Sequence, residues 1–376
     1  MTNALLPGLA ARSGLTQPER LAFAHRKIAL PVLLFLALVA LYASLVFVAL
    51  ATPSPWAFLL APVCGLVVGM LFIVGHDACH NSFTASSWLN QVIGRLAFLP
   101  SLHGFSLWDL GHNRMHHRYN NVRNRDLVWE PWSPDDYRTR GPIRRALYRF
   151  YRSPVGVPFY YMTVLWASYL TFSAPAIYRN MRLIYVADTA LWMLFLAAQC
   201  WVAVSVGAHF GHGIPASLAI GVVIPFLVWN GLMSVTVYVH HTHPLIRWYP
   251  DVAAWQADRG VVHGATHVHF VWPFSFLVLS IMEHNAHHVA PGVPFYNLRR
   301  MQRTMEAHES LLTWRFSLRG FLRVCERCKL YDYDLGRWVS FAEAERRMVP
   351  PLVTPPQPEH DPGKAIHASG GSIGRP

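Results

Sequence analysis

The residues with the clearest chemical potential in this sequence are histidines that recur in three short groups. These groups are His76 to His80, His112 to His117, and His284 to His288. Residues three or four positions apart on a helix lie on one face, with Cβ atoms about 5–6 Å apart. Each group can therefore present two or more imidazoles to one point, and His117, directly after His116, can reach a second point nearby. Imidazole is a common metal ligand, so the spacing predicts a polynuclear metal site.

Eight rings are the candidate ligands of this site: His76, His80, His112, His116, His117, His284, His287 and His288. Imidazole binds zinc, copper, iron and nickel alike, and no thiolate or carboxylate pair in the groups selects among these metals. Carboxylates that accept a hydrogen bond from a ligand ring would orient it. The candidates for that role are Asp77, Asp109 and Glu283. A helix cap or a solvated carboxylate is an equally good interpretation of each one.

The elements that must position these rings are apolar helices. Of the 376 residues, 14% are charged and 53% hydrophobic, whereas soluble domains carry roughly 25% charged residues. A membrane-spanning helix needs about 20 apolar residues. Four segments meet this requirement, and short connections join them in pairs: Ile28 to Leu50, Trp56 to Gly75, Ile184 to Val206 and Ile214 to Val239. We therefore expect an all-α integral membrane protein with two transmembrane helical hairpins.

Three further apolar stretches are short or broken by polar residues and proline: Val92 to Ser106, Val155 to Pro175 and Phe270 to Met282. We expect them to be interfacial or re-entrant, the second being the best candidate for an additional span. Residues 1–27 are expected to form a cytoplasmic segment without a signal peptide. Residues 28–348 then form the membrane domain, and the Pro-, Gly- and Ser-rich tail 349–376 is expected to be disordered.

Lysine and arginine predict the orientation. The connections 51–55 and 207–213 contain neither residue, whereas the segment between the hairpins and the part after Met282 are rich in arginine. By the positive-inside rule, both termini and all three histidine groups lie in the cytoplasm. The histidines then form a di-metal cap on a multi-pass protein of the inner or cytoplasmic membrane. Anionic headgroups account for the net charge of +12, so no nucleic-acid partner is required.

The motifs resemble those of the membrane fatty acid desaturases, whose hallmark is H-x-x-x-H, then H-x-x-(x)-H-H, then H-x-x-H-H. Three segments resemble these motifs with their usual flanks: Gly75 to Phe83, Trp108 to Asn121 and His284 to Arg299. His240 to Pro244 and Thr266 to Val268 are similar to segments that precede the third motif in the Δ12 (omega-6) type. The resemblance covers roughly residues 30–300.

The resemblance implies that the eight histidines hold two iron ions and that dioxygen is the co-substrate. It implies a long-chain acyl substrate in the membrane lipid, into which a cis double bond is inserted. Electrons would come from a separate carrier, such as a ferredoxin or a cytochrome b5-like protein. Arg144, Arg145 and Arg149 could dock an acidic carrier, although lipid headgroups explain the same charges.

One departure from the Δ12 type concerns a ninth ligand. Relatives of this type usually place a further histidine five or six residues before the third motif, where this chain has Val278 to Ser280. The candidates to replace it are His267, His263, a histidine of 240–243, or water.

Two other functions fit the same residues. A related di-iron oxygenase, namely a carotenoid ketolase or hydroxylase or an alkane hydroxylase, would place oxygen in its product. A histidine-rich metal transporter is the other alternative. Its ligands would be expected near the bilayer midplane, whereas these groups are predicted at the cytoplasmic ends of the spans.

Overall fold

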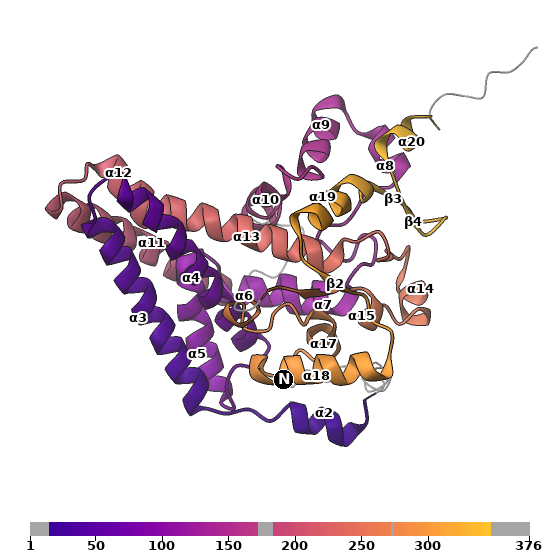
Figure 1. The fold of residues 1–376 in the computed structure, drawn as a ribbon, viewed down its shortest axis with the longest axis horizontal. Coiled ribbons are helices and arrows are strands. Elements are labelled where there is room, and N and C mark those ends of the chain that lie inside the picture. Colours follow the sequence, from indigo (N-terminus) through magenta and orange to yellow (C-terminus); the bar gives the residue numbers. More distant parts are fainter. Residues whose placement is uncertain (1–14, 172–182, 272–273, 347–376) are drawn as a thin grey trace, which may run out of the picture.

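The computed structural model describes residues 15–171, 183–271 and 274–346, and most of these residues are helical. The predicted disordered tail 349–376 and residues 1–14 lie outside this part. Four helices are long and apolar enough to cross a membrane (Figure 1): α3 (Ala29–Ala51), α4 (Trp56–Cys79), α11 (Leu183–His209) and the continuous stretch Ile214–His241. The last one comprises α12 (Ile214–Leu218), the π-helical η4 (Ala219–Val223) and α13 (Ile224–His241). The prediction of four apolar helices of spanning length is confirmed.

Large apolar side chains cover the outer faces of these helices. Leu59 on α4 is 65% exposed, and Leu194 and Trp201 on α11 are 69% and 71% exposed. Contiguous apolar surface of this extent is unfavourable in water and is what a spanning helix presents to hydrocarbon. The chain is therefore a membrane protein.

The two turns that join the long helices in pairs lie side by side. The Nε2–H of His212, in the turn before α12, is 3.0 Å from the carbonyl oxygen of Thr52, at the end of α3. The rings of Phe47 and Phe210 meet edge to face, with centroids 6.0 Å apart. Because α4 and the stretch Ile214–His241 both start at these turns, their C-terminal ends, which carry histidines, lie together at the other end (Figure 1).

Helix α4 is the centre of the helical part and packs against α3, α5 (Ser87–Phe98) and α13. Gly65 allows the close approach of α4 to α13. A Cβ at this position would lie 2.7 Å from the carbonyl oxygen of Pro225 and 2.8 Å from the Cβ of Val228. Small residues have this role wherever apolar helices pack without a hydrophobic driving force.

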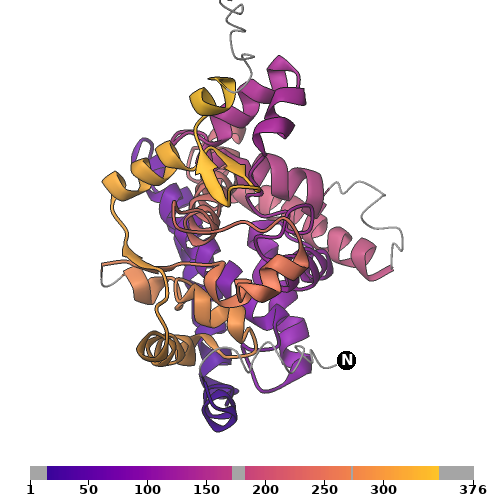
Figure 2. The ribbon, with the colours of Figure 1, turned by 90° about the vertical axis from the view of Figure 1, so that its right-hand side faces the viewer.

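The remaining helices surround and extend the histidine-bearing ends of α4 and α13 (Figure 1). They are α2 (Gln17–Phe23), η1 (Leu99–Ser101), α6 (Phe105–Trp108), η2 (Asp109–His116), α7 (His117–Tyr119), α8 (Pro134–Thr139), α9 (Pro142–Tyr151), α10 (Val157–Tyr160), η3 (Tyr161–Thr171), α14 (Val252–Ala257), α15 (Gly260–His263), α16 (Phe274–Leu277), α17 (His284–Val289), α18 (Phe295–His308), α19 (Leu318–Arg327) and α20 (Phe341–Arg346). Figure 2 shows the side of the molecule on which the orange α18 packs over the indigo α2.

The expectation of an all-α chain needs one correction, because the cap also contains two small sheets. Strand β1 (His267–His269) pairs in parallel with β2 (Thr313–Arg315). Strand β3 (Leu330–Asp332) pairs in antiparallel with β4 (Arg337–Val339). Each strand has three residues, which is too short for a periodic signal in the sequence.

None of the three weaker apolar stretches forms an additional span within the described residues. The first contains the end of α5, η1 and the start of α6, and the third contains the short helix α16. The described part of the second forms α10 and the π-helical η3, and its end lies outside the described residues. Their interfacial location remains a prediction.

Candidate metal centre

All eight predicted ligand histidines converge in the structure, and they do so in two adjacent groups. The five-histidine group consists of His76, His80, His112, His117 and His287. The four-histidine group consists of His116, His241, His284 and His288. Within each group, one ring nitrogen from every member lies within 4.8 Å of the others. The arrangement offers two neighbouring positions to metal ions, as the spacing predicted.

The contacts inside each group run between Nε2 atoms. In the five-histidine group, His112 Nε2 lies 2.9 Å from His76 Nε2 and 3.0 Å from His117 Nε2. In the four-histidine group, His284 Nε2 lies 3.0 Å from His241 Nε2 and 3.1 Å from His288 Nε2. The nitrogen atoms thus face common centres.

The second histidine motif is distributed between the groups by a π-helix. Residues Asp109–His116 form η2, and the backbone N–H of His117 bonds to the carbonyl oxygen of His112, five residues earlier. This winding brings His117 close to His112, and these two rings belong to one group, whereas His116 belongs to the other. The expectation that His112 and His116 point together assumed α-helical winding, and the structure differs here for that reason.

Helix α17 lies between the two groups. His284 and His288, four residues apart, face the four-histidine group, and His287 faces the five-histidine group. We expected two or more of these rings to share one point, and His284 and His288 do so. The rotation of about 100° per residue of an α-helix sends His287 and its neighbour His288 to different groups.

Hydrogen bonds to Nδ1 fix the orientation of three rings. His76 Nδ1 lies 3.0 Å from Asp77 Oδ1, and His116 Nδ1 lies 2.9 Å from Asp126 Oδ1. His241 Nδ1 lies 3.0 Å from the carbonyl oxygen of Gly264. A carboxylate or a carbonyl oxygen only accepts, so Nδ1 carries the proton and Nε2 of the neutral ring keeps its lone pair. These lone pairs face the group centres, as a metal ion requires.

Two of the three predicted orienting carboxylates contact no ring of the two groups within the described residues. Asp109 accepts from Asn113 Nδ2 at 2.7 Å and pairs with Arg114. Glu283 Oε2 is buried and has no hydrogen-bond partner within the described part of the chain. Only Asp77 contacts a ring, whereas Asp126, which sequence reasoning missed, holds His116. The sole signal for Asp126 was a carboxylate ten residues after His116.

Burial keeps the rings neutral. It lowers the pKa of His80, His112, His117, His284, His287 and His288 well below the ordinary value, and neighbouring imidazoles lower it further. Neutral imidazole is the form that binds metal. The buried Nε2 of His80 also has no hydrogen-bond partner among the described residues. A donor set of neutral rings with converging lone pairs fits two divalent metal ions of the kinds that imidazole binds, iron among them.

His241 occupies the place of a ninth ring. Its Nε2 joins the four-histidine group from the last turn of α13, so the structure favours position 241 among the candidates. His240 instead stacks on His284, with centroids 3.8 Å apart. His263 pairs with Glu309, and His267 lies in β1 beside Glu306; neither belongs to the two groups.

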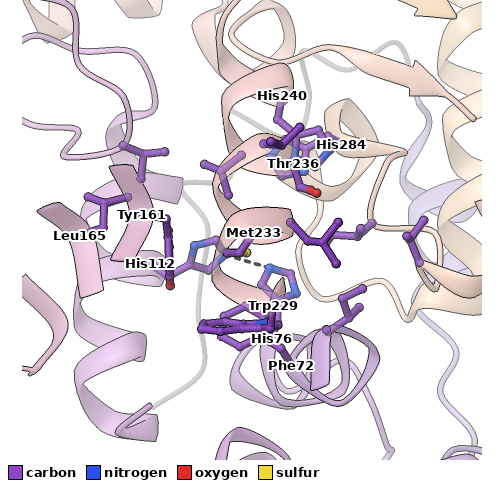
Figure 3. Close-up of a pocket in the computed structure, with 18 of the residues that line it drawn as sticks. Phe72, His76, His112, Tyr161, Leu165, Trp229, Met233, Thr236, His240 and His284 are labelled. Atoms are coloured by element: carbon purple, nitrogen blue, oxygen red, sulfur yellow. Dashed lines mark hydrogen bonds between the residues drawn. The ribbon is translucent and has the colours of Figure 1, made fainter. Parts of the chain in front are cut away.

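An apolar pocket of about 450 Å³ ends on both histidine groups. Its walls come from α4, α13 and η3, with Phe72, Tyr161 and Trp229 among them, and His76, His112 and His284 at its histidine end (Figure 3). Pockets of a few hundred Å³ with apolar walls are typical of sites for small apolar ligands.

The chain matches a known family over most of its length. The family described as Fatty acid desaturase matches residues 53–316. The sn-1 oleoyl-lipid 12-desaturase of Picosynechococcus sp. is 30% identical over 305 residues, covering 80% of this chain and 84% of that protein. The enzyme of the same description from Synechocystis sp. is 28% identical, covering 70% and 73%. The chloroplastic omega-6 fatty acid desaturase of Spinacia oleracea is 26% identical, covering 81% and 64%.

The fold and the site define a membrane protein with a buried polynuclear histidine centre that opens into an apolar pocket. The match covers well over half of the chain, so the chain belongs to the fatty acid desaturase family. It is accordingly an oxidoreductase that acts on lipid acyl substrates, as the histidine motifs predicted.

Proposed function

We propose that the protein is an O2-dependent desaturase that inserts a cis double bond at the Δ12 position of an oleoyl chain carried by a membrane lipid. The observation that carries this proposal is the apolar pocket that runs between α4 and α13 and ends on both histidine groups. The printed names of the relatives, oleoyl-lipid 12-desaturase among them, supply the bond position and the lipid carrier.

The nine rings of the two groups would hold two iron ions. When bound, iron would activate O2, which is the oxidant that the removal of hydrogen from an unactivated methylene requires. Overall, two adjacent methylenes lose two hydrogens, and O2 takes these with two electrons and two protons to form two waters. The buried histidine groups and the apolar walls exclude bulk water from the site.

The walls of the pocket would position the acyl chain. Tyr161 lines the pocket, and its hydroxyl lies 2.9 Å from Nε2 of the buried His103. His103 Nδ1 lies 2.8 Å from the carbonyl oxygen of Ser101, so Nδ1 donates and Nε2 accepts the proton of the tyrosine. This bond turns the Tyr161 hydroxyl away from the pocket and leaves an apolar ring surface for the methylenes.

The orientation and the electron source belong to the same proposal. The arginine-rich segments support a cytoplasmic active site in the inner or cytoplasmic membrane. Electrons would arrive from a separate carrier, a ferredoxin or a cytochrome b5-like protein. Arg144 and Arg145 on α9 offer positive charge to an acidic partner, whereas Arg149 is paired with Glu345.

Product analysis tests the function. The chain is expressed with an electron donor in a host that lacks polyunsaturated lipids, and lipid acyl chains are profiled by mass spectrometry. We expect a diunsaturated C18 chain with the new bond at Δ12, and none with His116→Ala. An unchanged profile with iron-loaded protein would refute desaturation, and oxygen in the product would favour the related oxygenases.

A further inference from the structure

A third set of possible metal ligands lies outside the two groups. His267 and His269 alternate along β1, so their side chains lie on the same face of the strand, and their ring centroids are 3.9 Å apart. Val268, between them, points into a buried apolar cluster. Glu306 on α18 meets this face, with Oε1 2.5 Å from His267 Nδ1. One ligand atom of each of the three residues lies within 4.8 Å of the others.

The carboxylate in this set is held in place. Gln302 Nε2, one turn earlier on α18, donates to Glu306 Oε1 at 2.9 Å. The side-chain oxygen of Gln302 accepts from the backbone N–H of Ala286 in α17 at 2.8 Å. The backbone N–H of His267 bonds to the carbonyl oxygen of Leu312, which fixes β1 from the other side. Oriented ligands of this kind are a mark of built metal sites.

We propose that His267, His269 and Glu306 form a third metal site, separate from the catalytic centre, that takes a divalent ion of the zinc or iron class. Two imidazoles and one carboxylate suit these ions and leave positions for water. His267 is 6% exposed, whereas His269 is exposed, so the site opens to solvent.

An ion at this site would join two elements that flank α17. Its ligands come from β1 and α18, both of which contact α17, and Gln302 already connects Glu306 to the backbone of α17. The ion therefore stabilises the surroundings of the third histidine motif without touching its rings. Because an ion that binds only the folded chain raises its stability, zinc should raise the unfolding temperature.

Zinc titration of the purified, iron-loaded full chain in detergent tests the site. Calorimetry should find one zinc site in the wild type while the iron content stays constant. His269→Gln and Glu306→Gln should each weaken this binding at least about tenfold and abolish the zinc-dependent rise in unfolding temperature. His308→Gln, an exposed histidine on the same helix, is the matched control and should bind zinc as the wild type does.

Two results would overturn the proposal. One is a wild-type chain that retains its iron and takes up no zinc, which would leave His267 and Glu306 as a simple hydrogen-bonded pair. The other is equal zinc binding by the wild type, His269→Gln and Glu306→Gln. Because His269 is exposed, its replacement by glutamine should leave the fold intact, and iron content in each variant checks this.

Discussion

At the residue scale, the nine rings differ in how firmly the protein holds them. His76, His116 and His241 are each anchored through Nδ1 by a protein oxygen. The Nδ1 atoms of His117, His284 and His288 are buried and have no hydrogen-bond partner among the described residues. Anchored ligands lose less freedom when a metal binds. Each of the three anchored rings should therefore contribute more to metal affinity than a ring whose Nδ1 has no such partner.

His241 offers a direct test of the ninth ring. His241→Ala removes one of four ligands from the four-histidine group, so we expect the iron content to fall from two ions per chain toward one, with loss of desaturation. Iron is measured by mass spectrometry on purified protein. His243→Ala, two residues further on and outside both groups, is the control and should keep both. Full iron content in His241→Ala would contradict the assignment.

Asp126 orients a histidine ring, whereas Asp109 bonds elsewhere, so substitutions of the two residues can be compared. Asp126→Asn removes the charge that fixes the tautomer of His116, and changes of this kind cost about 10–100-fold in metal affinity or activity. Asp109→Asn alters a carboxylate that bonds Asn113 and Arg114 and should leave both quantities near wild type. The assay measures iron retention against a chelator and product formation. Equal losses in the two variants would rule out a special role for Asp126.

Glu130 predicts a pH dependence of stability. Burial raises the pKa of this carboxyl to about 7, although Asn124 N donates to it. The pKa of this carboxyl in the unfolded chain is near 4.5, so the folded chain binds the proton more tightly. The contribution of the protonated Glu130 to the free energy of unfolding is therefore complete below the unfolded pKa. It is lost as the pH rises through about 7.

Glu130→Gln should therefore stabilise the protein at pH 8 relative to pH 5, by up to about 3 kcal/mol. Thermal unfolding in detergent at the two pH values measures the difference. The exposed Glu326→Gln makes the same charge change at the surface and should leave the difference between the two pH values as in the wild type.

The eight motif histidines could be predicted from the sequence, because a spacing of three or four residues places ligands on one face of a helix. The sequence named His241 only as one of several candidates, because His241 lies 43 residues before His284 and its contact with that ring depends on the tertiary fold. Asp126 was missed for a similar reason, since it lies in a loop where no periodic pattern marks its contact with His116.

At the element scale, hydropathy predicted the long helices to within a few residues, because a span must be apolar over its whole length. The winding of the second motif was not predictable in this way. Nothing in the types of residues 109–116 distinguishes π- from α-helical hydrogen bonding, and yet this winding decides which ring joins which group. Strands β1 and β2 are far apart in the sequence, whereas β3 and β4 pair locally. Each strand has only three residues, and all four were missed.

Gly65 and Gly69 test the packing of α4 on α13. Gly65→Ala would bring a Cβ within 2.7 Å of the Pro225 carbonyl oxygen. Overpacking of this kind costs about 1–3 kcal/mol of stability. The gain in helix propensity from glycine to alanine is about 1 kcal/mol. In Gly69→Ala the new Cβ would lie 3.6 Å from Trp229 Cδ1, an ordinary contact distance, so the gain in helix propensity is not offset by overpacking. We expect a lower unfolding temperature for the first variant only. Equal temperatures would mean that the two helices can separate slightly at no cost.

At the scale of the whole molecule, the two turns between long helices lie at one end and the histidine groups at the other. Because the turns and the histidine groups lie at opposite ends, the arginine distribution predicts on which side of the membrane each of them lies. If the arginine-rich segments face the cytoplasm, then the turn around Ser54 must face outward, and the metal centre has access to intracellular electron carriers. The opposite orientation would separate the centre from any such carrier.

Cysteine accessibility decides between these orientations. Ser54→Cys lies in an exposed turn, and Asp135→Cys lies in the arginine-rich segment with a side chain that is 76% exposed. A membrane-impermeant maleimide added to intact cells should label Ser54→Cys, and should label Asp135→Cys only after the membrane is permeabilised. The native thiols are a low background, because Cys64, Cys79, Cys325 and Cys328 are buried, and the wild type controls for Cys200. The reverse labelling pattern would place the histidine centre outside the cell and remove the basis for a cytoplasmic electron donor.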